Sequence, residues 1–99
     1  MKNSNPLEKD IEKKVVEYAK SLGLLSYKFT SPAKRSVPDR IFITPKGHVF
    51  FMEVKRRGCK PTPAQEVEIM KLIKQRANVY VVDLVENGKA VIDLELFGE

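Results

Sequence analysis

The sequence is poor in the residues on which several common chemistries depend: its 99 residues include one cysteine, one histidine and no tryptophan. A single cysteine, Cys59, excludes an internal disulfide and the ligand spacing of a zinc finger, and it is typical of a reducing cytoplasm. The single histidine, His48, lies beside a predicted turn, and no Ser/His/Asp or Cys/His arrangement can be assembled. Covalent nucleophilic catalysis is therefore not expected.

Long apolar runs are missing as well. No run approaches the roughly 18–20 residues of a membrane span, and residues 1–10 lack the apolar segment of a signal peptide. We therefore expect no membrane contact and a cytoplasmic location.

The composition is that of a folded domain with a basic surface. Hydrophobic residues make up 42% of the chain and charged residues 31%, which argues against general disorder. A length of 99 residues is enough for one domain with one core and too short for two. The 18 Lys and Arg exceed the 13 Asp and Glu by 5, and this excess favours a polyanionic partner such as DNA.

Residues 38–55 form the stretch around which the chain is organised. Two apolar runs rich in β-branched and aromatic residues flank Pro45-Lys46-Gly47, a pattern that predicts a β-hairpin with a three-residue loop. Counting outward from this loop places Asp39 opposite Glu53, with Lys55 two residues further along the same face. Both faces of the hairpin are apolar, which predicts strands inside a sheet covered on both sides.

Two opposed carboxylates indicate a cation site. Like charges opposite each other destabilise a strand pair, and hard oxygen ligands of this kind suit Mg²⁺ or Mn²⁺. A nearby ammonium, that of Lys55, can hold a water for metal-assisted phosphodiester hydrolysis. The alternative is a hairpin end with a surface ion pair between Glu53 and Lys55. For either acid alone that reading is preferred, but Pro-Asp followed by Glu-x-Lys at matching register favours the metal site.

The chain before the hairpin reads as a helix and a strand. Apolar residues at the helical period predict an amphipathic helix over residues 6–22 and a strand over residues 24–30. Glu8 falls on the buried stripe at the helix start, where an acid can simply complement the helix dipole. Glu12, one step round the same face, is the alternative to Glu8 if an acid of this helix takes part in the site.

The chain after the hairpin predicts a helix and two strands. Thr62 as N-cap and Gln65 three residues later form a capping box that opens a helix over residues 62–77. A strand over residues 79–83 should run parallel to the Glu53 strand in a βαβ unit. Residues 86–89 read as a turn, followed by a half-buried terminal strand that carries Val91, Ile92, Leu94, Leu96 and Phe97.

Two basic loops flank the proposed metal site. Their cations are candidates for phosphate contact, although each loop could equally be a solvated basic turn. The first loop carries Lys34 and Arg35, and the second carries Arg56, Arg57 and Lys60.

The quoted motifs resemble a known nuclease signature. Pro38-Asp39 followed by Glu53-Val54-Lys55 is similar to the PD-(D/E)XK motif. The flanks resemble its virus-type replication-repair branch, VRR-NUC: Glu8 in the opening helix, the Ser36 to Arg40 segment, and Thr62-Pro63-Ala64-Gln65 at the second helix. The resemblance covers residues 7–83. Ser36 departs from the pattern, where a glycine is common, and leaves the metal ligands untouched.

The resemblance implies an α/β fold with a restriction-endonuclease-like αβββαβ core, in which a small mixed sheet has a helix on each face. It implies a Mg²⁺- or Mn²⁺-dependent deoxyribonuclease that leaves a 5′-phosphate. Asp39, Glu53 and the carbonyl of Val54 would bind the metal. Lys55 would activate the attacking water, and Glu8 and Gln65 would complete the pocket.

It also implies a partner and a context. We expect a homodimer, paired through the apolar terminal strand, that acts on branched DNA such as four-way junctions in a phage, prophage or bacterial repair setting. The alternative for that strand is packing on the chain's own helices. The alternative function is a non-enzymatic nucleic-acid-binding module that uses the basic loops.

Overall fold

The computed structural model describes residues 7–98. Within them, none of the helices combines the length and the apolar character needed to cross a membrane. In chain order the elements are α1 (Glu8–Ser21), β1 (Leu25–Lys28), β2 (Arg40–Ile43), β3 (Val49–Val54), α2 (Pro63–Lys74), β4 (Asn78–Val82) and α3 (Val85–Phe97).

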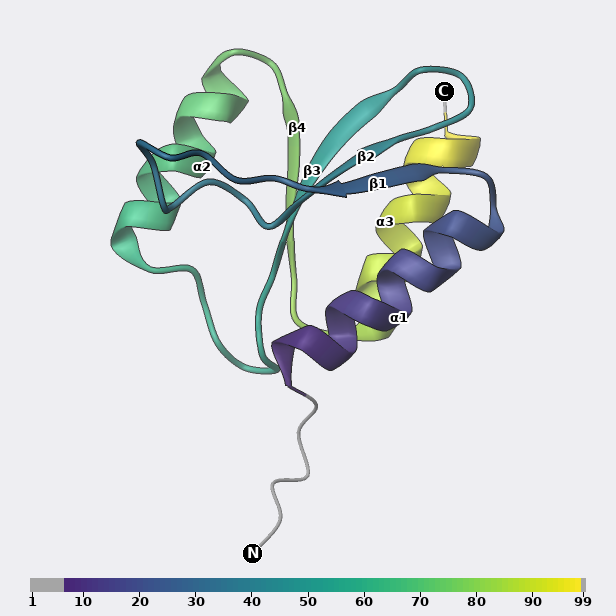
Figure 1. Cartoon of the computed structure of the whole chain (residues 1–99), viewed down its shortest axis with the longest axis horizontal. Helices are drawn as coiled ribbons and strands as arrows, with labels where there is room; N and C mark the ends of the chain where they lie inside the picture. The colour runs from purple at the N-terminus through teal and green to yellow at the C-terminus, as the bar shows by residue number, and fades with distance from the viewer. Residues whose placement is uncertain (1–6, 99) are drawn as a thin grey trace, which may run out of the picture.

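The strands form one mixed sheet in the order β1-β2-β3-β4. The first three strands are antiparallel to their neighbours, and β4 runs parallel to β3 after the crossover through α2, as the sequence predicts. Figure 1 shows α2 on one side of the sheet and α1 with α3 on the other. The mixed sheet with helices on both faces is therefore confirmed. The predicted elements from the first helix to the fourth strand are present with ends shifted by a few residues, and Pro6 lies outside the described residues.

The hairpin between β2 and β3 has the predicted register. Ile41 pairs with Phe51, and the Thr44 N–H donates to the His48 carbonyl at 2.9 Å across the loop. Gly47 has a φ of 88°, the left-handed conformation that the three-residue loop requires. The ladder ends at the pair Arg40 and Met52, one residue before the two predicted metal ligands.

One face of the sheet carries the core. Alternate residues of β2 and β3 point toward α1 and α3 and are almost fully buried: Phe42, Phe50, Met52 and Val54. They pack on apolar residues of the two helices, including Ile11, Val15 and Ala19 of α1 and Ile92 of α3. The close packing on this face makes it the rigid side of the sheet.

The other face is only partly covered. The helix α2 packs mainly on β4, and the strand residues beside it stay open to solvent: Leu25 is 52%, Tyr27 53%, Val49 42% and Val81 44% exposed. The prediction of a sheet covered on both sides therefore holds for one face alone. The proposed site lies on the open face, because Glu53 alternates with the buried Met52 and Val54.

The C-terminal segment is a helix, and the predictions of a turn at residues 86–89 and a terminal strand are wrong. Apolar alternation at residues 92, 94 and 96 fits a strand locally, but long-range packing decides for α3. Gly88 lies against Val15 of α1, and the Tyr80 hydroxyl donates to Glu95 Oε2 at 2.5 Å. There is consequently no apolar strand edge at this end of the chain, although Leu94 and Phe97 are exposed on the helix surface.

The helix crossing at Gly88 gives a test of α3. A Cβ at position 88 would lie 2.5 Å from Val15 Cγ2. Overpacking costs about 1–3 kcal/mol, more than the roughly 0.5–1 kcal/mol that alanine gains over glycine inside a helix. Gly88→Ala should therefore lower the free energy of unfolding measured by denaturant titration.

A Val15→Ala background is the control, because it removes the two methyl groups that the new Cβ meets. Gly88→Ala should be neutral or stabilising there. An equal loss in both backgrounds would contradict the α1–α3 crossing.

Candidate active site

The end of β3 places a carboxylate and an ammonium side by side. Glu53 is 1% exposed, and Lys55 Nζ lies 3.4 Å from Glu53 Oε2. The Lys55 N–H donates to the Val82 carbonyl at 2.8 Å, which continues the parallel pairing with β4 past the end of the strand. The main chain of Lys55 is thus fixed by the sheet, so its side chain is held beside Glu53.

Asp39 reaches the same place from the residue before β2. Its Oδ2 accepts the N–H of Val54 at 2.9 Å, and its carbonyl accepts the N–H of Phe29 at 2.9 Å. The prediction that Asp39 lies across from Glu53 is confirmed in position. The two residues lie beyond the last pair of the β2–β3 ladder. The Val54 N–H of β3 therefore donates to the Asp39 carboxylate.

Both acids of the site are costly to ionise. Burial first, and the charge of Asp39 second, raise the pKa of Glu53 to about 7, against the lowering effect of Lys55. Burial also raises the pKa of Asp39, against the lowering effect of the hydrogen bond from Val54. Charge on the two carboxylates is therefore under-compensated, which is the electrostatic condition for cation binding.

Gln65 serves the helix cap and the site together. Its Oε1 accepts a hydrogen bond from the Thr62 N–H at 2.8 Å, and its main-chain N–H donates to Thr62 Oγ1 at 3.2 Å. The predicted capping box is therefore present. Its Nε2 donates to Glu53 Oε2 at 2.9 Å. The two roles use different atoms of one side chain, because the amide has an acceptor end and a donor end.

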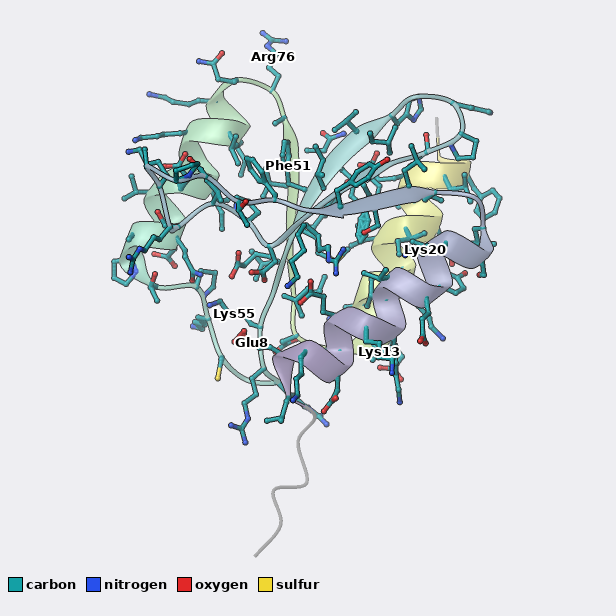
Figure 2. All side chains as sticks on the ribbon, viewed as in Figure 1. Glu8, Lys13, Lys20, Phe51, Lys55 and Arg76 are labelled. Atoms are coloured by element: carbon teal, nitrogen blue, oxygen red, sulfur yellow. The ribbon has the colours of Figure 1, made fainter. Side chains whose placement is uncertain are left out.

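The two acids of α1 have different surroundings. Glu12 Oε2 is 2.6 Å from Arg40 Nε and 3.5 Å from Lys28 Nζ, so this carboxylate pairs with cations on the core side of the sheet. Glu8 is exposed in the first turn of α1, and its charge acts on both Asp39 and Glu53. Figure 2 shows Glu8 and Lys55 at the same end of the sheet. Both charges raise the pKa of Asp39, but Glu12 is paired with Arg40, and of the two acids only Glu8 also acts on Glu53.

The predicted DNA-binding cations lie around this site. Lys34 and Arg35 are exposed and border a hollow that reaches Asp39. Past β3, Arg57 and Lys60 are exposed and Arg56 is half-buried. Both loops therefore offer charge to solvent close to the two acids.

Two structural residues escaped the sequence reasoning. Asp83 Oδ2 accepts the N–H of Gly58 at 2.9 Å and so ties the second basic loop to the end of β4. Arg40, next to Asp39, holds α1 through Glu12. Their positions in the sequence could have indicated them, because each lies at a strand end that borders the site. Their partners, however, are distant in sequence.

Comparison with known proteins identifies the family. No protein-family model matches the chain. A solved structure described as "VRR_NUC domain" superposes with a TM-score of 0.80 at 31% identity, covering 87% of this chain and 94% of the other. A protein of Acyrthosiphon pisum secondary endosymbiont phage 1, named "Putative nuclease p44", is 42% identical over 76 residues, which are 77% of this chain and 82% of that protein. The chain belongs to the VRR-NUC family.

The donor set of this VRR-NUC chain fits a hard divalent cation. Glu53 Oε1 is buried and has no hydrogen-bond partner among residues 7–98, while Oε2 is engaged by Gln65 and Lys55. No group of three or more His, Cys, Asp and Glu residues suited to a metal occurs in that part of the chain. Mg²⁺ is commonly held by one or two carboxylates with water completing its shell, so Asp39 and Glu53 are sufficient protein acids.

The raised pKa of Glu53 predicts how stability depends on pH without metal. The pKa is about 7 in the folded chain against an ordinary 4.5. Burial favours the protonated Glu53 over the ionised form. Its contribution to the free energy of unfolding is therefore complete below pH 4.5 and is lost as the pH rises through about 7. The free energy of unfolding of the wild type should fall over this interval relative to Glu53→Gln, measured by denaturant titration in EDTA.

Glu53→Gln is a close neutral analogue that keeps an oxygen for the Gln65 amide. A difference between the two proteins that stays constant with pH would contradict the raised pKa.

Proposed function

We propose that the protein is a metal-dependent DNA endonuclease. The observation that supports this most directly is the buried Glu53 carboxylate, whose Oε1 has no partner in the described chain, beside Asp39 and Lys55. A buried charge without compensation is costly, and a divalent cation held by Asp39 and Glu53 would compensate it. The names of the two relatives agree with an enzyme that cuts nucleic acid.

Each residue of the site has a role in hydrolysis of a phosphodiester. Asp39 and Glu53, with the Val54 carbonyl, would hold Mg²⁺ or Mn²⁺, which supplies charge neutralisation at the phosphate when bound. The Lys55 ammonium would donate a hydrogen bond to the attacking water and fix it in line with the bond to be broken. Gln65 keeps the Glu53 carboxylate oriented through the Nε2 contact.

The reaction forms one bond and breaks one. The water oxygen attacks phosphorus, the bond from phosphorus to O3′ breaks, and the phosphate stays on the 5′ end. The water proton leaves to solvent, and the O3′ leaving group takes up a proton. Glu8, exposed at the rim with its charge acting on both acids, would hold a further water at the site.

The rival function is a nucleic-acid-binding module without catalysis. Its support is the basic surface, with Lys34, Arg35, Arg57 and Lys60 exposed. The placement of Asp39 beside the buried, incompletely bonded Glu53 carboxylate argues against it, because such a pair is costly to fold and brings no benefit to a pure binder of a polyanion. In the nuclease, the same cations would contact backbone phosphates on both sides of the cut.

A homodimer is part of the proposal, with its contact surface moved to α2. With the terminal strand replaced by a helix, the exposed apolar stripe nearest the site consists of Val67, Met70 and Ile73. An antiparallel α2 pair centred on Met70 would place Val67 against the partner's Ile73. It would also place Glu66 against the partner's Lys74, so apolar and charged contacts match about one two-fold axis.

Branched DNA, and a four-way junction above all, is the substrate that suits such a dimer. One chain offers one pair of metal-binding acids, and a two-fold dimer offers two sites related by symmetry, as the paired cuts of a junction require. Since a relative is encoded by a phage, we place the activity in DNA repair or recombination in the cytoplasm of a bacterial host.

The site assignment predicts three inactive variants. Asp39→Ala, Glu53→Ala and Lys55→Ala should each lower the cleavage rate by at least about a hundredfold, because metal-assisted charge stabilisation is worth several kcal/mol. The fold should remain intact by circular dichroism. Without metal, Glu53→Ala should be at least as stable as the wild type because it removes a buried charge, whereas Asp39→Ala should be less stable because it leaves the buried Val54 N–H without its acceptor.

Mn²⁺ titration by calorimetry separates the nuclease from the binding module. The wild type should bind Mn²⁺ and Asp39→Ala should not, while the exposed α1 variant Glu17→Ala keeps both binding and cleavage. Cleavage near the wild-type rate in any of the three site variants would overturn the assignment.

The dimer surface predicts a matched pair of outcomes. Met70 and Leu94 are each 57% exposed, on α2 and α3. Light scattering should give the wild type a mass of twice 11.3 kDa, and Met70→Asp should give a monomer because it places two acids at the two-fold axis. Leu94→Asp should remain a dimer.

Junction cleavage is the functional half of this test. The wild type should cut a four-way junction faster than a plain duplex of equal length, and Met70→Asp should lose this preference. A monomeric wild type refutes the dimer, and dissociation by Leu94→Asp alone would move the interface to α3.

A further inference from the structure

We infer that the hollow beside Asp39 binds the base of one unpaired nucleotide next to the phosphate that is cut. This inference rests on the proposed nuclease function and adds what the enzyme reads on its DNA. The hollow has a volume of about 300 Å³ and lies between the end of β1, the first basic loop and Asp39. Its wall includes Phe29 and Val37, and Lys28, Lys34 and Arg35 border it.

The charges around the hollow favour a phosphate-bearing ligand. Lys34 and Arg35 are exposed and make no ion pair within residues 7–98. Lys28 is paired with Glu12 at 3.5 Å but keeps 67% of its side chain exposed. Three cations therefore face the one acid of the hollow, Asp39, and a DNA strand that passes along them would carry its phosphates there.

The apolar wall of the hollow favours a base. Phe29 is half-buried, and its ring centroid lies 5.3 Å from that of Phe51, with the rings tilted by 44°. Figure 2 shows Phe51 near the centre of the sheet, and this residue, which lies on the open face, packs against the Phe29 ring. An aromatic ring held in this way is a stacking surface that any base can use.

Asp39 determines which nucleotide enters. Asp39 borders the hollow and also lies with Glu53 at the proposed metal site. A base in the hollow would thus belong to a nucleotide that adjoins the cut phosphate. Bases of an intact duplex are paired and stacked, and taking one out costs energy that an unpaired nucleotide does not require. The hollow would consequently favour cleavage at a branch point or a single-stranded end over plain duplex.

A scan with abasic residues tests for the base and leaves the phosphates in place. Branched substrates would carry one abasic residue at successive positions around the cut, and kcat/KM would be measured with Mn²⁺. For the wild type, one position beside the cut should lower kcat/KM on the order of tenfold, the range expected for loss of one stacked base. The other positions should change it little.

Phe29→Leu identifies the stacking residue, because leucine keeps the apolar contact with Phe51 and removes the aromatic face. It should cut the intact substrate on the order of tenfold more slowly and should ignore the abasic residue. Tyr27→Leu is the matched control: Tyr27 lies on β1 two residues before Phe29, is exposed, and does not border the hollow. It should behave as the wild type.

The outcomes separate the hollow from the nuclease itself. A wild type that cuts these substrates and is insensitive to an abasic residue at every position overturns the hollow and leaves the nuclease proposal standing. Sensitivity that persists in Phe29→Leu overturns the stacking role of Phe29. Absence of cleavage on every substrate overturns the proposed function together with the hollow. The wild-type scan decides whether a base is read, whether or not the variant folds.

Discussion

The structure depends on one costly feature, the burial of the Glu53 carboxylate inside a small sheet. A buried carboxylate must be neutralised, hydrogen-bonded or paired, and here the compensation comes from two residues. Lys55 lies directly after the same strand, and Gln65 reaches the carboxylate from α2, whereas Asp39, held by the Val54 N–H, adds like charge. The compensation is incomplete, because Oε1 has no partner in the described residues and the pKa is raised to about 7.

This requirement explains the arrangement of the elements around β3. The parallel strand β4 fixes the main chain of Lys55 through the Val82 carbonyl, and the crossover to β4 brings the start of α2 beside Glu53. The capping box positions Gln65 in the first turn of that helix, where its amide nitrogen is left over for the carboxylate. On the other face, the pair of Glu12 with Arg40 fixes α1 and thereby the place of its first turn. The face packed by α1 and α3 is rigid, and the partly covered face carries the site.

The sequence was sufficient for the local half of the site. Pro45-Lys46-Gly47 determines the register of the hairpin, and the register brings Asp39 near Glu53 and Lys55. The sequence was insufficient where contacts between distant elements determine the local structure. The terminal segment alternates like a strand at residues 92, 94 and 96, yet it folds as α3 because Gly88 fits against Val15 and Tyr80 bonds Glu95. Glu12 and Glu8 likewise look equivalent on one helix stripe, and only the position of Arg40 in three dimensions separates them.

The partial cover of the active face follows from the length of α2 and has a consequence for substrate access. With 12 residues packed mainly on β4, α2 leaves β1 and β2 open. In the proposed nuclease, a DNA strand would approach Asp39 along the first basic loop without any element having to move, since Lys34 and Arg35 are already exposed. A sheet covered on both faces would bury more apolar area, which stabilises the folded state by about 25 cal/mol for each Å². Such a cover would also close this approach. In the proposed nuclease, the open face would give up this stability so that a phosphate could reach Asp39 and Glu53 at the end of β3.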